Sequence, residues 1–286
     1  MRDQADRLRK LARGSKQSEK TTKVITVTSG KGGVGKSNFV VNLSIMLQKM
    51  GRKVLIFDAD IGMANDEILM GFVPKYNILD CINRNLDIED IMITGPEGVK
   101  LISGGTGLNK IRELQEEEIR ILLSKLEKLE DYDYIIMDTG AGVNETVINF
   151  IGFSDEFILL TTPEPTSIMD GYSLLKTVSY FNVKNMVSIV VNRVYNEKEG
   201  EKTFLKLNNA SKKFLSIDCN FMGTVEEDKK LTEAVRKQVP IVVSFPNSKV
   251  SKNISTIAKI IDNNNIVNKE EKRVNHLFKN ILQLFR

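Results

Sequence analysis

A phosphate-binding loop near the start of the chain constrains its fold more than any other feature. The pattern G-x-x-x-x-G-K-[ST] follows the β-branched run 24–27 and opens a helix-like segment; it consists of Gly30, Lys31, Gly32, Gly33, Val34, Gly35, Lys36 and Ser37. Glycines let successive backbone N–H groups point at phosphate oxygens. The motif predicts that Lys36 neutralises the β- and γ-phosphates and that Ser37 holds Mg²⁺. The alternative is a glycine-rich turn without a ligand.

Acidic residues follow two further apolar runs. Run 53–57 precedes Asp58 and Asp60, and run 134–137 precedes Asp138 and a glycine-rich turn. Open α/β sheets bind ligands at the carboxyl ends of their strands, so these carboxylates are site candidates. Asp58 and Asp60 point to opposite sides of an extended chain, which predicts different roles. Asp138 fits a Walker B aspartate beside a loop that responds to the γ-phosphate, whereas Asp58 and Asp60 could also be acceptors in a turn.

The rest of the chain alternates between apolar runs and segments of helical period. Strands are expected at 24–28, 53–58, 99–103, 134–138, 156–161, 187–191, 220–224 and 241–243, and helices at 36–50, 112–130, 144–152, 167–180, 201–215, 229–236 and 250–263. Such alternation predicts an α/β fold, with a mostly parallel twisted sheet covered by helices on both faces.

Composition excludes several classes of protein. The 286 residues include no stretch apolar enough to span a bilayer, and residues 1–23 lack the apolar segment of a secretory signal. Cys81 and Cys219 are isolated, so neither a zinc site nor an iron–sulfur scaffold is indicated. A cytoplasmic protein is therefore expected.

Positive charge is concentrated at the two ends. Residues 1–23 hold eight Lys or Arg against three Asp or Glu, and residues 269–286 hold five against two, so the net +4 leaves about −4 for the middle. This distribution favours anionic partners at the termini. It disfavours a basic central surface, and no specific nucleic-acid binding is expected.

The C-terminal segment has the pattern of an amphipathic helix. Its apolar residues recur every three or four positions: Val274, Leu277, Phe278, Ile281, Leu282 and Phe285. The polar stretch 262–265 predicts a short mobile connection before it. Phenylalanine and leucine beside flanking cations suit an anionic membrane surface, although a helix packed on the domain shows the same spacing. Both arrangements can alternate, with the helix docked in the monomer and released in the dimer.

Lys31, a second lysine inside the phosphate loop, resembles the extra lysine of the MinD and ParA family of ATPases. The resemblance implies ATP and ADP as ligands, a homodimer with ATP, and Lys31 reaching the partner's nucleotide. It also implies that Asp58 and Asp138 hold Mg²⁺ through water and that Asp60 orients the attacking water. A further implied contact to adenine falls on Asn192, with a weaker one on Asp228. A strand-end asparagine that caps a turn is the competing interpretation.

The N-terminal arm carries a second resemblance. The string D-Q-A-x-x-L-R, formed by Asp3, Gln4, Ala5, Leu8 and Arg9, resembles the activator motif of the FlhG family of MinD-like ATPases. In that family the segment stimulates the GTPase FlhF, and flagellar basal-body or C-ring components are further partners. Without the resemblance, the composition of the same residues indicates only a solvated arm.

Together these features predict three parts: an activator arm at 1–22, an ATPase domain at 23–265 and a membrane-targeting helix at 266–286. The expected function is an ATP-hydrolysing switch that controls flagellar number and placement. Its ATP-bound dimer is expected at the inner face of the cell membrane. A division-site MinD-type regulator and a ParA-like DNA-partitioning ATPase are the alternatives. An iron–sulfur carrier ATPase would need cysteines that this chain lacks.

Overall fold

The computed structural model describes residues 22–60, 66–104 and 115–264. The arm residues Asp3 to Arg9 and the tail residues Val274 to Phe285 lie outside the described residues, so their predicted roles stay predictions. In the described part, no helix is long and apolar enough to cross a membrane.

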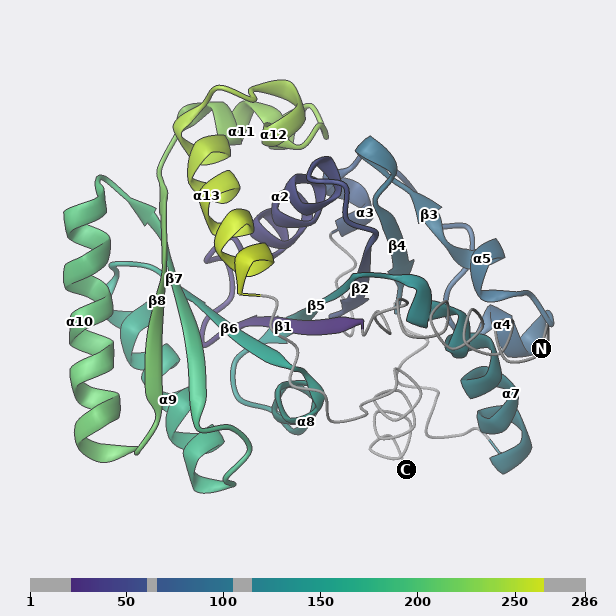
Figure 1. Cartoon of the computed structure of the whole chain (residues 1–286), viewed down its shortest axis with the longest axis horizontal. Helices are drawn as coiled ribbons and strands as arrows, with labels where there is room; N and C mark the ends of the chain where they lie inside the picture. Colours follow the sequence, from purple (N-terminus) through teal and green to yellow (C-terminus); the bar gives the residue numbers. More distant parts are fainter. Residues whose placement is uncertain (1–21, 61–65, 105–114, 265–286) are drawn as a thin grey trace, which may run out of the picture.

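The described residues form an eight-stranded sheet with the order β3-β4-β2-β5-β1-β6-β7-β8 (Figure 1). Every neighbouring pair is parallel except β3 and β4. The strands are β1 (Lys23–Ser29), β2 (Val54–Ala59), β3 (Ile93–Thr94), β4 (Lys100–Ser103), β5 (Tyr134–Ala141), β6 (Glu156–Thr161), β7 (Met186–Val194) and β8 (Asp218–Glu226). The predicted α/β class with a mostly parallel sheet is confirmed.

Helices cover both faces of the sheet. One face packs against α2 (Lys36–Lys49), α11 (Lys229–Arg236), α12 (Ile241–Ser244) and α13 (Lys249–Asn263). The other face packs against α4 (Asp80–Asn83), α5 (Ile88–Ile91), α7 (Glu116–Leu126), α8 (Glu145–Phe153), α9 (Pro165–Tyr180) and α10 (Glu197–Phe214). The short helix α3 (Asp66–Leu69) packs against α2. Single 3₁₀ turns occupy Pro96–Gly98 and Glu127–Asp131.

The central strands are buried on both faces, which explains their continuous apolar sequences. On β5, Tyr134 and Ile136 belong to the core under α2 and α13, whereas Ile135 and Met137 belong to the core under α7. Successive side chains of a strand point to opposite faces, so one apolar run supplies two cores. The sheet therefore holds β1, β2 and β5 rigidly, and their carboxyl ends define the site.

Two predictions about local structure are wrong. Residues 241–243, expected as a strand, lie in helix α12, where Pro240 precedes the first turn and the Val242 N–H donates to Asn42 Oδ1 at 3.1 Å. A short apolar run fits a buried strand and a buried helix equally well. The expected mobile connection at 262–265 begins too early, because Asp262 belongs to α13 and accepts two hydrogen bonds from Arg52.

Candidate nucleotide-binding site

The phosphate loop connects β1 to α2 at the carboxyl edge of the sheet, with β1 between β5 and β6. Gly33 and Gly35 have φ values of 78° and 93°, which L-residues with a side chain rarely adopt. A Cβ atom on Gly30 would overlap the backbone of Asp170 and Gly171 in α9. The loop thus needs glycine for its turn and for its close approach to α9.

Lys36 and Asp138 form a buried ion pair at the floor of the site. Lys36 Nζ lies 2.6 Å from Asp138 Oδ1, and the two side chains are 8% and 1% exposed. The strands position them, because β1 and β5 are neighbours and Asp138 lies opposite Val27. The lysine expected at the phosphates and the aspartate expected at Mg²⁺ therefore meet directly.

Asp58 and Asp60 extend this group from β2. Asp58 lies opposite Asp138 in the parallel ladder, and one of its oxygens, Oδ1, accepts a hydrogen bond from the Asp60 N–H at 3.0 Å. Its other oxygen finds no hydrogen-bond partner among the described residues. Burial, only partly offset by that hydrogen bond, raises the pKa of Asp58 to about 8, with smaller contributions from neighbouring carboxylates.

Asp60 is less deeply buried and borders the carboxyl end of β5. Burial raises its pKa above the ordinary value, the Lys36 charge lowers it and the Asp138 charge raises it. A Cβ atom on Gly140 would lie 3.3 Å from Asp60 Oδ1. Glycine at position 140 therefore leaves room for the Asp60 carboxylate beside Asp138.

Two acidic residues of this region were not singled out by the sequence analysis. Asp66 and Glu67 start α3 and are 0% and 1% exposed. A four-residue helix has no periodicity that a sequence pattern can reveal. The only available signal was the pair of adjacent acids shortly after Asp60.

Lys31 contacts α9 of its own chain. Its Nζ lies 3.2 Å from Glu164 Oε2 and 3.0 Å from Thr166 Oγ1, and its side chain is 41% exposed. Glu164 and Thr166 flank the first residue of α9. The structure contains a single chain, so the predicted contact of Lys31 with a partner's nucleotide stays a prediction.

The two residues expected near adenine lie in different settings. Asn192 is 5% exposed, and its Nδ2 donates to the carbonyl of Val34 in the phosphate loop at 2.7 Å. Asp228 caps α11 by accepting a hydrogen bond from the Lys230 N–H at 2.9 Å. The structure thus brings Asn192 to the loop, whereas the side chain of Asp228 satisfies a helix terminus.

The donor set of the site fits a hydrated Mg²⁺ ion. The Ser37 hydroxyl and the carboxylates of Asp58 and Asp138 are oxygen donors, which Mg²⁺ prefers, and one oxygen of Asp58 is buried without a partner in the described part. No three acidic, cysteine or histidine side chains of the described residues converge to hold an ion directly. Because Mg²⁺ keeps several waters, carboxylates that bind through water match this arrangement.

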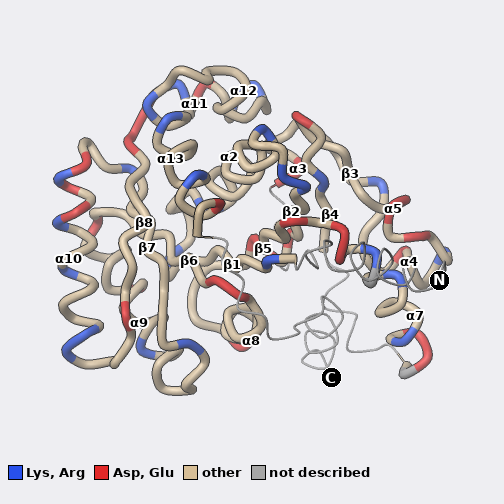
Figure 2. Tube along the Cα trace, in the orientation of Figure 1, with Lys and Arg blue, Asp and Glu red and all other residues tan. Residues whose placement is uncertain are grey.

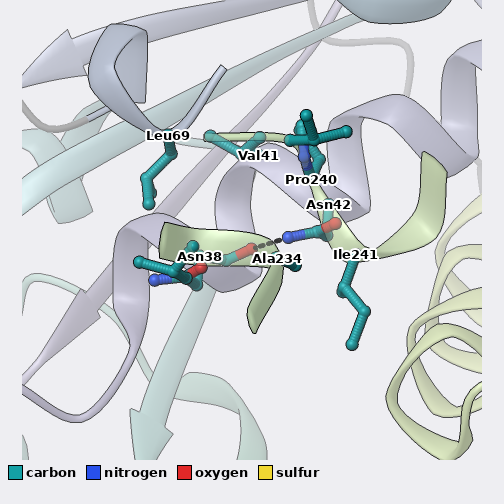
Figure 3. A pocket seen from close by; sticks show the side chains of 9 residues that line it. Asn38, Val41, Asn42, Leu69, Ala234, Pro240 and Ile241 are labelled. Atoms are coloured by element: carbon teal, nitrogen blue, oxygen red, sulfur yellow. Dashed lines mark hydrogen bonds between the residues drawn. The ribbon is translucent and has the colours of Figure 1, made fainter. Parts of the chain in front are cut away.

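A narrow depression lies between α2 and the segment from α11 to α12 (Figure 3). Its lining combines α2 and the last residue of α3 with the segment from α11 to α12 and comprises Asn38, Val41, Asn42, Leu69, Ala234, Val235, Val239, Pro240 and Ile241. The Asn42 amide bridges this lining by donating to Asn38 O and accepting from Val242 N. The Asn42 side chain is thus occupied by backbone groups, which indicates a helix-packing seam rather than a phosphate site.

Comparison with known proteins agrees with this geometry. Residues 20–262 match the sequence model of the ParA family, described as the NUBPL iron-transfer P-loop NTPase. Antiactivator FleN of Pseudomonas aeruginosa is 33% identical over 240 residues, which cover 84% of this chain and 86% of FleN. Flagellum site-determining protein YlxH of Helicobacter pylori is 35% identical over 251 residues, which cover 84% of this chain and 82% of YlxH.

Solved MinD structures share the fold. The MinD protein of Pyrococcus horikoshii complexed with Mg-ADP has a TM-score of 0.65 and 25% identity, with 84% of this chain and 96% of that one covered. The MinC:MinD complex of Aquifex aeolicus gives a TM-score of 0.66 and 26% identity, with 87% and 99% covered. The resemblance to FlhG-type MinD-like ATPases is confirmed: the chain belongs to the ParA/MinD family of P-loop NTPases and, within it, resembles antiactivator FleN and the flagellum site-determining protein YlxH.

Proposed function

We propose that this protein is an ATP-hydrolysing switch of the FlhG type, which controls flagellar number and placement. The observation that carries the proposal is the convergence of the phosphate loop with Lys36, Asp58, Asp60 and Asp138 at the carboxyl edge of the sheet, in a chain similar to FleN and YlxH. ATP and ADP are the proposed ligands, with Mg²⁺ as the cofactor.

Each residue of the site has a proposed part in hydrolysis. Backbone N–H groups of residues 30–36 hold the phosphate oxygens, and Lys36 leaves Asp138 to neutralise the β- and γ-phosphates. Mg²⁺, held by Ser37 and through water by Asp58 and Asp138, supplies positive charge to the phosphates. Asp60, beside Gly140 near the carboxyl end of β5, orients the attacking water. Asn192 contacts adenine from β7, where it also binds the phosphate loop.

The nucleotide cycle is proposed to control assembly. With ATP bound, Lys31 leaves Glu164 and Thr166 and contacts the nucleotide of a second copy, which links hydrolysis to dimerisation. A dimer presents two C-terminal helices to one anionic membrane surface, which raises avidity by on the order of 10²-fold. The 266–286 segment is the proposed membrane helix, and it acts at the inner face of the cell membrane.

The N-terminal arm is the proposed partner segment. Residues 3–9 dock on FlhF and stimulate its GTP hydrolysis, while flagellar basal-body or C-ring components bind elsewhere. Lysines and glutamates alternate in the first turns of α10 (Figure 2), so this part of the surface is not uniformly basic, which supports a role without specific nucleic-acid binding.

Recovery of partners by ATP-locked protein tests the proposal. An Asp60→Ala variant loaded with ATP and used as bait in a lysate should capture FlhF. Addition of ATP should not increase the capture of FlhF by a Lys36→Ala variant. Capture of a division protein instead would support the MinD-type alternative, and capture of DNA would support the ParA-type alternative.

A further inference from the structure

Asp66 and Glu67 carry buried carboxylate oxygens that the described residues leave unsatisfied. Both oxygens of Asp66 and the Oε2 of Glu67 have no hydrogen-bond partner there. The remaining oxygen of Glu67 accepts a hydrogen bond from the Ser103 hydroxyl at 3.4 Å. Buried carboxylates are costly unless they are paired or bind a metal, so these two residues require an explanation.

The sheet places Glu67 beside the nucleotide site, because Ser103, which donates to Glu67 Oε1, lies opposite Asp58 in the ladder between β4 and β2. Burial raises the pKa of Asp66 well above its usual range, the carboxylates of Asp138 and Asp58 raise it further, and Lys36 lowers it. The charge of Glu67 in turn raises the pKa of Asp58. Sheet register and the Ser103 contact thus bring several buried carboxylates to one region, and we call Asp58, Asp66, Glu67 and Asp138 the acidic cluster.

Among the described residues, the cation that contacts the acidic cluster is Lys36, and the proposed function also assigns Lys36 to the phosphates. Lys36 contacts Asp138 at 2.6 Å and also lowers the pKa of Asp60 and of Asp66. When Lys36 turns to phosphate, as the proposed function requires, Asp138 loses the cation that it contacts. A hydrated divalent cation replaces that charge and brings water molecules to the unpartnered oxygens of Asp58, Asp66 and Glu67, and oxygen-only donors select Mg²⁺ or Mn²⁺.

From this we infer that Asp66 and Glu67 are metal-site residues, which hold the water shell of a divalent cation together with Asp58 and Asp138 and admit the ion before nucleotide binds. The inference rests on the Mg²⁺ site of the proposed function and adds two residues from α3 to it. Contact through water agrees with the absence of a ready-made direct metal cluster in the described residues. Because α3 packs against α2, occupation of the site fixes α3 beside the phosphate loop.

Metal binding without nucleotide tests this inference. We would measure Mn²⁺ binding by electron paramagnetic resonance, and the Tm of the full chain in EDTA and in excess MgCl₂ or MnCl₂. The variants are Asp66→Asn and Glu67→Gln, which keep the side-chain shapes. Glu117→Gln in α7, where the side chain is 75% exposed, is the matched control.

Excess metal should raise the wild-type Tm by about 5 °C without nucleotide. Asp66→Asn and Glu67→Gln should bind Mn²⁺ about tenfold more weakly and lose at least half of that rise. The Glu117→Gln control should match the wild type throughout.

Two results would overturn the inference: a wild-type Tm that metal alone leaves unchanged, or a full metal-induced rise in the Asp66→Asn variant. Binding of a fluorescent ATP analogue in the presence of Mg²⁺ separates this failure from that of the proposed function. If the wild type binds the analogue, only the assignment of Asp66 and Glu67 fails. If it does not bind the analogue, the proposed function fails as well.

Discussion

Lys36 on α2 and Asp138 on β5 form an ion pair, with 2.6 Å between Nζ and Oδ1. The two residues are 102 positions apart in the sequence, and both are almost fully buried. Each therefore compensates the charge that the other brings into the core. Mutation of the two residues can separate the effect of the ion pair on folding stability from its effect on ATP binding.

Lys36→Met should destabilise the fold by about 3 kcal/mol, because it leaves Asp138 buried without its cation. The double variant Lys36→Met/Asp138→Asn should regain most of that stability. Neither variant should bind ATP, since the cation for the phosphates is missing. Urea unfolding and binding of a fluorescent ATP analogue measure the two effects. Equal stability of the single and double variants would show that the unpaired Asp138 carboxylate is not the cause of the loss.

Gly30 and Gly32 offer a matched pair within the phosphate loop. Gly30→Ala should destabilise the protein by about 2 kcal/mol or more and weaken ATP binding, because its methyl group overlaps the backbone of Asp170 and Gly171. Gly32→Ala should cost much less, since no described atom lies within 4 Å of its Cβ position. Thermal unfolding of both variants checks the difference, and equal losses would contradict the packing of the loop on α9.

The site could be predicted where its signals are local. The strand that precedes Gly30, the runs that end in Asp58 and Asp138, and the Lys-Ser pair are all short patterns, and the parallel sheet then brings them to one edge. The contact of Lys31 with Glu164 joins residues 133 positions apart, which no local pattern reveals.

Other parts could not be predicted because the deciding interaction is tertiary. Residues 241–243 are helical where the Val242 N–H meets the Asn42 side chain, 200 positions away in the sequence. Asp66 reads as an ordinary polar residue until the fold buries it beside Asp138. Both errors concern residues whose environment comes from distant segments.

The proposed membrane helix predicts a face-specific effect. Phe278→Glu with Phe285→Glu should abolish ATP-dependent sedimentation with anionic liposomes, because charge enters the inserting face. Asn280→Glu, on a polar position, is the matched control and should retain most binding. ATP turnover in solution should change little in either variant. Full liposome binding by the double phenylalanine variant would assign the helix a structural role instead.

The N-terminal arm predicts an effect that is separable from the ATPase domain. Deleting residues 1–20 should leave ATP binding intact and remove stimulation of FlhF. A peptide of those residues should stimulate FlhF GTP hydrolysis alone, its Gln4→Ala version should do so poorly, and its Lys16→Ala version should act like the parent. If both the peptide and the full chain leave FlhF at its basal rate, the FlhG assignment gives way to the MinD-type alternative.

The central claim is that ATP and Lys31 together control dimerisation, while Asp60 controls turnover. Light scattering of the wild type, Asp60→Ala and Lys31→Ala with ATP and Mg²⁺ tests it most directly. Asp60→Ala should accumulate as a stable dimer that hydrolyses ATP slowly, because the loop and Lys36 remain. Lys31→Ala should remain a monomer even with saturating ATP. A monomeric Asp60→Ala protein beside a dimeric Lys31→Ala protein would contradict the account.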